Sequence, residues 1–336
     1  MCHQLGLDGA IKVHGRIPVL EKPLIAGETH LEPQYEILSD AFSRLIDPDA
    51  RLRKLGEGYL WAEGTTWVPD VSEEGGGYLL WSDIPNDRML RWSESDGTTT
   101  FRQPCGYTNG HTLDREGRLV SAEHGGRRIS RTEPDGTVVN LVDNYEGKTL
   151  NSPNDVVVKS DGSIWFTDPP YGILSDRQGH KADSELGANY VFRLWPDTGK
   201  MEIVIDDFDM PNGIAFSPDE SIMYLADTGY ELESPEASIH AFDASPDGTL
   251  SNHRIYAKPD SGKSDGFRVD TDGNVWTSAG DGVHVFNPAG ELLGKILTPD
   301  RNANLDFGGP NGTTLFIGVN AEAYSIEVNA RRAARP

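Results

Sequence analysis

A motif that repeats along this chain constrains its fold more than any other feature. The clearest copy, residues 154–168, reads NDVVVKSDGSIWFTD: a polar pair, an apolar run, a Ser-Asp-Gly turn, a run rich in β-branched and aromatic residues, and a final acid. Two such runs joined through Asp-Gly are typical of a β-hairpin. The polar residues that begin and end the motif are therefore expected to meet at one end of the hairpin, opposite its turn.

Six copies of this motif can be recognised, and we call the first residue of each copy its start residue. The start residues are Glu63, Asn109, Asn154, Asn212, Asp265 and Asn304. In the four strongest copies a turn residue follows eight positions later, at Gly117, Gly162, Glu220 and Gly273. The copy at Glu63 is interrupted by an insertion at residues 72–77, and the weak copy at Asn304 has its turn at Gly312.

The spacing of the copies predicts the architecture. Consecutive start residues are about 40 to 60 positions apart, and further strand-like runs lie between them, which is the unit of a four-stranded β-propeller blade. The sequence therefore predicts an all-β fold, a six-bladed β-propeller over residues 51–336. Residues 1–50 are expected to form an N-terminal extension with a short helix at residues 35–45. Longer insertions at residues 169–189 and 228–238 are expected to be lids or surface loops.

Charge and composition exclude several classes of partner. The chain has 336 residues and a formal net charge of −23, which argues against nucleic acid or an anionic membrane as a partner, because binding to either requires a basic surface. Its two cysteines, Cys2 and Cys105, are too few for a disulfide framework. We see no apolar run that could span a bilayer and no secretory signal in this chain, so a cytoplasmic or periplasmic location is expected.

The start residues are the candidate functional site. In a propeller the innermost strands begin at one mouth of the central channel, so these six oxygen-bearing side chains should form a ring there. Hard oxygen donors suit Ca²⁺ or Mg²⁺ better than zinc, and the two negative charges of Glu63 and Asp265 would balance a divalent cation. The alternative is that Asn-Gly and Asp-Gly pairs only form turns at blade junctions.

A second acidic set ends the second strand of four copies, and we interpret it either as groups that orient ligands or as ordinary polar strand ends. Its members are Asp83, Glu123, Asp168 and Asp227. His124 and Arg127 in EHGGRR and Tyr171 in DPPYG lie beside this set. The chain has no G-x-S-x-G, H-E-x-x-H, Walker A or G-x-G-x-x-G motif, which argues against a serine hydrolase or a nucleotide-dependent enzyme.

These blocks resemble the gluconolactonase, senescence marker protein and luciferin-regenerating enzyme family of six-bladed propellers. The resemblance covers residues 55–328 and rests on AEGTTW, NGHTLDREGRLVSAEHGGRR, LNSPNDVVVKSDGSIWFTDPPYG, MPNGIAFSPDE and SDGFRVDTDGNVW. The EHGGRR and SPNDVVVKSDGSIWFTDPPYG blocks are similar to the bacterial gluconolactonase branch. The resemblance implies a divalent metal, usually calcium, and the opening of sugar lactones such as glucono-1,5-lactone.

By position, the resemblance implies that Glu63, Asn154, Asn212 and Asp265 are metal ligands and that Asn109 is a substrate-side amide. Mg²⁺, Mn²⁺ and Zn²⁺ are alternatives to calcium. Tyr107 departs from the family, because some relatives carry a substrate-binding arginine there.

We therefore expect a metal-dependent lactonase whose partner is a small sugar lactone. Asp265 is the candidate general base, in competition with another carboxylate or a metal-bound water. Asn109, His124 and Arg127 would bond the hydroxyls of the substrate, and Tyr171 would cover its ring. The alternatives are a phosphotriesterase-like hydrolase using the same metal site and a non-catalytic calcium-binding propeller.

Overall fold

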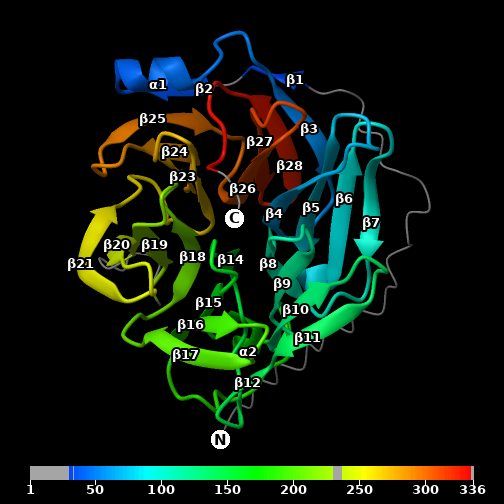
Figure 1. The fold of residues 1–336 in the computed structure, drawn as a ribbon. Coiled ribbons are helices and arrows are strands. Elements are labelled where there is room, and N and C mark those ends of the chain that lie inside the picture. Colours follow the sequence, from blue (N-terminus) through cyan, green and yellow to red (C-terminus); the bar gives the residue numbers. More distant parts are fainter. Residues whose placement is uncertain (1–29, 33, 230–236, 334–336) are drawn as a thin grey trace, which may run out of the picture.

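Six antiparallel sheets surround a central axis in the computed structural model, which describes residues 30–32, 34–229 and 237–333 (Figure 1). Each sheet is one blade, with its innermost strand at the axis. The prediction of an all-β, six-bladed propeller is confirmed. None of the described helices is long and apolar enough to cross a membrane.

The first four blades each consist of four strands that follow one another in the chain, from the axis outward. The first blade contains β4 (Ala62–Pro69), β5 (Gly77–Asp83), β6 (Arg88–Ser93) and β7 (Gly97–Arg102). The second contains β8 (Thr108–Leu113), β9 (Leu119–Glu123), β10 (Arg128–Thr132) and β11 (Val138–Val142). The third contains β14 (Val156–Val158), β15 (Ile164–Asp168), β16 (Tyr190–Trp195) and β17 (Lys200–Ile205). The fourth contains β18 (Pro211–Phe216), β19 (Ile222–Asp227), β20 (Ser238–Ala244) and β21 (Leu250–Ala257).

The last two blades recruit strands from the N-terminal part of the chain, which closes the ring. The fifth contains β22 (Phe267–Val269), β23 (Val275–Ser278), β24 (Gly282–Phe286), β25 (Leu292–Leu297) and β2 (Gln34–Ile37). The sixth contains β26 (Asn302–Gly308), β27 (Thr314–Val319), β28 (Glu322–Glu327), β3 (Leu52–Glu57) and β1 (His30–Leu31). The remaining elements are α1 (Asp40–Leu45), η1 (Ile84–Asn86), α2 (Tyr171–Leu174) and the pair β12 (Asn144–Tyr145) and β13 (Lys148–Thr149).

The repeat motif forms the inner hairpin of each blade, and its turn residues have the left-handed backbone that such turns require. The φ angles are 78° at Gly117, 83° at Gly162 and 82° at Gly273. Glu220 adopts a φ of 57° although it is not glycine. The turns therefore lie at one end of the channel, and the start residues lie at the other.

Apolar side chains pack between neighbouring blades and form the core. At the junction that closes the ring, the Trp67 ring of the first blade stacks on the Phe316 ring of the sixth with centroids 5.1 Å apart. Between the third and fourth blades, Trp165 meets Phe216 edge to face at 5.3 Å. Burial of apolar side chains such as these is the dominant favourable contribution to folding.

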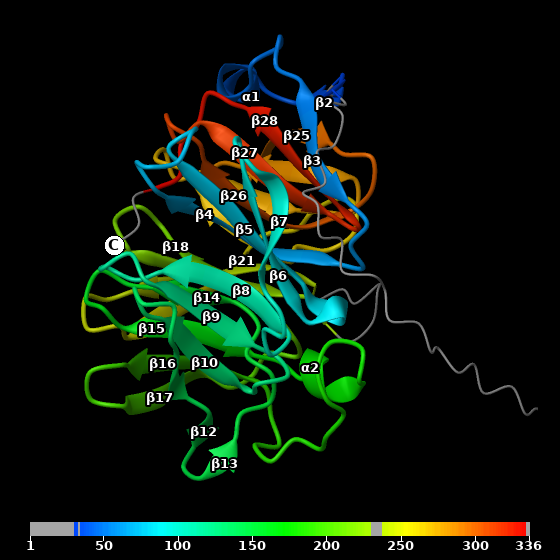
Figure 2. The same ribbon diagram turned by 90° about the vertical axis from the view of Figure 1, so that its right-hand side faces the viewer.

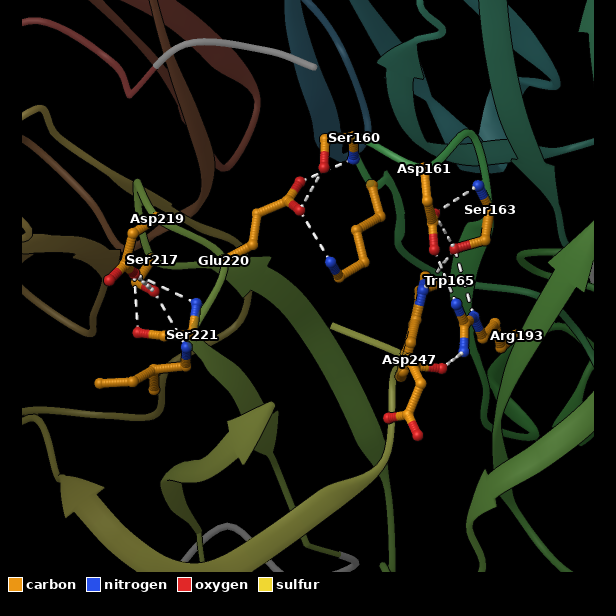
Figure 3. Close-up of polar contacts among 12 residues, drawn as sticks. Ser160, Asp161, Ser163, Trp165, Arg193, Ser217, Asp219, Glu220, Ser221 and Asp247 are labelled. Atoms are coloured by element: carbon orange, nitrogen blue, oxygen red, sulfur yellow. Dashed lines mark hydrogen bonds and ion pairs between the residues drawn. The ribbon is translucent and has the colours of Figure 1, made fainter. Parts of the chain in front are cut away.

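Polar contacts join neighbouring blades at the turn end of the channel (Figure 3). The Glu220 carboxylate of the fourth blade accepts hydrogen bonds from Lys159 Nζ at 2.8 Å and from the Ser160 backbone N–H at 2.7 Å, both in the third blade. In the third blade, Asp161 pairs with Arg193 Nη2 at 2.7 Å. These hydrogen bonds and ion pairs hold the hairpin turns in place and stabilise the propeller at this end.

The helix predicted at residues 35–45 is shorter than expected. Residues Gln34–Ile37 instead form β2, which extends the fifth blade by pairing with β25. The Ser39 hydroxyl accepts the Phe42 N–H at 3.3 Å and caps a helix that begins only at Asp40. Residues 34–37 thus form a strand because they pair with the edge strand β25, although the apolar spacing of the segment alone suggested a helix.

Candidate active site

A cavity of about 470 Å³ opens at the channel mouth that bears the start residues. Five of the six start residues line it: Glu63, Asn109, Asn154, Asn212 and Asp265. The structure therefore brings together side chains that are far apart in the sequence. The sixth, Asn304, lies below them: its Nδ2 donates to Glu63 at 3.3 Å and its Oδ1 accepts the Thr65 hydroxyl at 3.1 Å.

The buried Glu63 and the half-buried Asp265 form a carboxyl pair that lines the cavity. Burial, and then repulsion by Asp265, raise the pKa of Glu63 well above its usual value, although N–H groups of Trp61 and Gly64 oppose the shift. Burial raises the pKa of Asp265 to about 6, and Asp155 adds to this shift while Glu63 and Asn212 oppose it. Among the described residues, no Lys, Arg or His forms an ion pair with either carboxyl, although the positive charge of Arg301 opposes the rise in the pKa of Asp265. A carboxyl pair of this kind favours a proton or a metal cation between its members.

The donor set of this site fits a divalent cation. Two carboxyl groups supply negative charge, and the side-chain amides of Asn154 and Asn212 line the same cavity and add neutral oxygens. The side-chain amide of Asn154 has no hydrogen-bond partner among the described residues. The Asn304 oxygen is engaged by Thr65 and by the Leu305 N–H, so it offers less to a cation. The assignment of Glu63, Asn154, Asn212 and Asp265 as ligands remains a prediction.

Three of the four acids in the second set hold the loops that carry the start residues. Asp168 accepts the backbone N–H groups of Asn151 and Ser152, each at 2.8 Å, just before Asn154. In the first blade, Asp83 accepts hydrogen bonds from the backbone N–H groups of Leu60 and Trp61, just before Glu63. In the fourth blade, Asp227 accepts hydrogen bonds from the backbone N–H groups of Asp209 and Met210, just before Asn212. These carboxylates therefore position the site through backbone contacts, a role that their equivalent places in the repeat could have indicated.

The second blade departs from this pattern. Glu123 pairs with Arg128 Nε at 2.7 Å. The Cys105 and Tyr107 N–H groups, which precede Asn109, are instead held by Asp87 at 3.0 and 2.7 Å. Asp87 lies in the first blade, so this loop is fastened from the neighbouring sheet.

The four residues predicted to contact substrate occupy different positions. Asn109 lines the cavity, and its Nδ2 lies 3.3 Å from Nε2 of His124, which is buried behind it. Burial lowers the pKa of His124 to about 4, so its ring is neutral at ordinary pH.

Tyr171 lines the cavity at the start of α2, and its hydroxyl contacts that of Thr228. Arg127 does not line it, because its Nε donates to the carbonyls of Leu150 and Asn151 at 2.6 and 3.1 Å.

The insertion at residues 169–189 contributes directly to the cavity. It contains α2, which lies at the margin of one face of the ring in the side view (Figure 2). Tyr171, Leu174 and Gln178 from this insertion line the cavity. The second long insertion, at residues 228–238, falls largely outside the described residues.

Several lining residues lie outside the repeat positions, so the sequence argument did not find them. They are Trp61, Lys263, Arg301 and Asn302. The Trp61 indole N–H donates to Glu63 at 3.2 Å, and the Arg301 guanidinium lies over the Trp61 ring, 4.4 Å from its centroid. Trp61, Lys263 and Asn302 each stand two positions before a start residue, and Arg301 stands three before one, so the register of the repeat could have indicated them.

A second group with metal-binding side chains lies on the fifth blade. Donor atoms of Asp260, Asp281 and His284 are within 4.8 Å of one another. The Lys295 ammonium already pairs with Asp260 at 2.8 Å and with Glu36 at 2.9 Å. This cluster is therefore an ion-pair network that fastens β2 to the fifth blade.

Comparison with known proteins agrees with the propeller fold. The family described as "SMP-30/Gluconolactonase/LRE-like region" matches residues 55–320. Gluconolactonase from Zymomonas mobilis is 32% identical over 312 residues, which cover 86% of this chain and 84% of that protein. Pentonolactonase XacC from Haloferax volcanii is 26% identical over 282 residues, 82% of this chain and 84% of that protein.

A gluconolactonase structure from Xanthomonas campestris superposes with a TM-score of 0.81 at 38% identity, covering 90% of this chain and 96% of that one. The family match spans all six inner hairpins and therefore includes every start residue. The chain belongs to the SMP-30/gluconolactonase/LRE-like family.

Proposed function

We propose that this protein is a metal-dependent lactonase that opens sugar lactones such as glucono-1,5-lactone to the aldonic acid. The observation that carries the proposal is the carboxyl pair of Glu63 and Asp265 in a cavity that the side-chain amides of Asn109, Asn154 and Asn212 also line. The lactonase relatives support the same reaction class. Such a cavity combines a place for a cation with neutral groups that can bond the hydroxyls of a sugar.

Glu63, Asp265, Asn154 and Asn212 would hold the cation, and Ca²⁺ suits these oxygen donors best. A bound divalent cation supplies Lewis acidity that draws charge from a lactone carbonyl. Trp61 keeps Glu63 in place through its indole N–H, at 3.2 Å. Asp168 and Arg127 fix the loop before Asn154, so Arg127 acts as a positioning residue.

Asp265 is the proposed general base. It accepts a proton from a water molecule while the water oxygen adds to the lactone carbonyl carbon. The bond between the carbonyl carbon and the ring oxygen then breaks, and the ring oxygen takes the proton back from Asp265 and leaves as a hydroxyl group. The products at neutral pH are the open-chain hydroxycarboxylate and one proton released to solvent. Asn109, backed by His124, offers a hydrogen bond to a substrate hydroxyl, and Tyr171 covers the ring from the side of α2.

A pH-indicator assay tests the reaction class, because lactone opening releases acid. We expect glucono-1,5-lactone to be hydrolysed above the spontaneous rate, the activity to be lost in chelator and to return with Ca²⁺. The phosphotriester paraoxon serves as the competing substrate. Hydrolysis of paraoxon alone would instead favour the phosphotriesterase, and inactivity towards both with calcium bound would favour a non-catalytic propeller.

A further inference from the structure

One wall of the cavity takes no part in the proposed reaction. Three of its residues, Lys263, Arg301 and Asn302, lie in or directly after the loops that enter the fifth and sixth blades, and we call them the donor wall. The loops that build this side approach closely at Gly262 and Gly280. A Cβ on Gly262 would lie 2.7 Å from the backbone of Gly280, so the two glycines let the loops close around the wall.

Arg301 presents unused hydrogen-bond donors at the cavity rim. Its guanidinium lies over the Trp61 ring, and the indole N–H of Trp61 is itself held by Glu63. The guanidinium forms no hydrogen bond or ion pair with a described residue, and the neighbouring Asp300 carboxylate is bonded to Asn320 Nδ2 at 2.7 Å. Stacking uses the face of a guanidinium and leaves its N–H groups pointing outward in the ring plane. Arg301 is therefore an exposed, oriented cation without an ion pair, and its charge acts to lower the pKa of Asp265 and Asp300 from a distance.

Asn302 adds a buried donor beside Arg301. Its Oδ1 accepts the Ala279 N–H at 2.9 Å, which fixes the direction of the amide. Its Nδ2 is buried and has no hydrogen-bond partner among the residues that the structure describes. An unpaired buried N–H is uncommon in folded proteins, so a water molecule or a ligand oxygen is expected to complete its bonding.

Lys263 brings a second positive charge to the donor wall. Its ammonium group donates to the Thr228 carbonyl and lies 3.5 Å from that of Gly229. The wall thus contains two cationic side chains and an amide whose oxygen is already engaged. A hydroxyl group needs both a donor and an acceptor to be satisfied, whereas an oxyanion only accepts, so a wall that only donates suits an oxyanion.

We propose that the donor wall binds a negatively charged substituent of the substrate, so that the preferred substrates are sugar lactones bearing a carboxylate, phosphate or sulfonate group away from the ring carbonyl. This inference rests on the proposed lactonase function and makes it more specific. Arg301 and Asn302 are its specificity-determining residues. The overall charge of −23 repels anions at long range, which makes a local cationic subsite necessary for such a substrate.

Calorimetric titration tests the subsite without relying on turnover. With Ca²⁺ present, we expect 6-phosphogluconate and glucarate to bind at least about tenfold more tightly than gluconate, which lacks the second anionic group. In Arg301→Gln this ratio should fall by about tenfold, the loss typical of one charge-assisted contact. Asn302→Asp keeps the shape but adds a repelling charge and should abolish the preference. The phosphate and carboxylate probes show which anion the wall accepts better.

Arg115→Gln is the matched control, because Arg115 is exposed in the turn between β8 and β9 at the opposite end of the channel and its loss changes net charge equally. It should leave the ratio unchanged. Equal affinity for all three acids in the unmodified protein, or an equal fall in Arg115→Gln and Arg301→Gln, would overturn the proposal. If no lactone is hydrolysed but the anionic acids still bind more tightly through Arg301, the lactonase function fails and the anion subsite stands.

Discussion

Keeping both Glu63 and Asp265 ionised in the cavity costs free energy, because the carboxylates are shielded from water and repel each other. The stability of the metal-free protein should therefore depend on pH. Folding raises the pKa of Asp265 from 3.8 to about 6, and burial raises that of Asp168 to about 7. A carboxyl group whose pKa rises on folding holds its proton more tightly in the folded state. Its stabilising contribution is therefore complete below the unfolded pKa and is lost as pH rises through the folded pKa.

We expect the Tm of the metal-free protein to fall as pH rises from about 4 to about 7 because of these groups. Asp265→Asn should make this slope shallower, since it removes one titrating member of the pair. Saturating Ca²⁺ should also flatten the profile, because it binds the deprotonated carboxylates. Differential scanning calorimetry measures the effect, and an identical slope in Asp265→Asn and the unmodified protein would refute it.

Asp168 provides a second test at the residue scale. Its two oxygens accept the N–H groups of Asn151 and Ser152, so Asp168→Asn replaces one acceptor by an amide donor and leaves one buried N–H unpaired. We expect a loss of about 1–3 kcal/mol in unfolding free energy. The loop before Asn154 should also loosen, so calcium affinity should fall. Asp161→Ala, at the opposite end of the same hairpin, should lower stability without weakening calcium binding.

At the level of elements, the inner hairpins could be predicted because a period-two pattern and an Asp-Gly turn are local signals. The start residues followed from the same register, and five of the six line one cavity. The helix at residues 35–45 was predicted too long because pairing of β2 with the distant β25 decides that segment. The contact between Trp61 and Arg301 was missed because it joins residues far apart in the chain, which local sequence patterns do not reveal.

The insertion that carries α2 should control which lactones are accepted. Tyr171 and Gln178 place it beside Asn109 around the cavity, where it can enclose a polyhydroxylated ring. Sites built to bond hydroxyls discriminate against analogues that lack them, because buried polar groups are left unpaired. We expect a higher kcat/KM for glucono-1,5-lactone than for δ-valerolactone.

Replacing residues 175–187 by a short Gly-Ser linker should reduce this preference while calcium affinity stays nearly constant, since none of the proposed ligands lies in that segment. Steady-state kinetics with both lactones measures the ratio. Equal kcat/KM values for the two lactones in the intact protein would rule out a sugar-specific pocket, even if calcium-dependent hydrolysis were observed.

At the scale of the whole molecule, circular closure gives the site its precision. β3, from the N-terminal part of the chain, pairs with β28 near the C-terminal end, so the sixth blade is completed by both parts. Each blade then contributes one start residue to the same mouth. A cavity assembled from six separate hairpins needs the entire ring, because displacement of any blade would move one of its donors.

The central claim is that the Glu63 and Asp265 pair holds the cation on which lactone hydrolysis depends. The rate of glucono-1,5-lactone hydrolysis as a function of Ca²⁺ concentration tests it most directly, in the unmodified protein, in Glu63→Gln and in the control Asp161→Ala. The account predicts saturable calcium activation in the unmodified protein and in Asp161→Ala. It predicts a loss of at least about a hundredfold in kcat/KM for Glu63→Gln, equivalent to about 2.7 kcal/mol of transition-state stabilisation. A folded Glu63→Gln variant that reaches the unmodified rate at the same calcium concentration would contradict it.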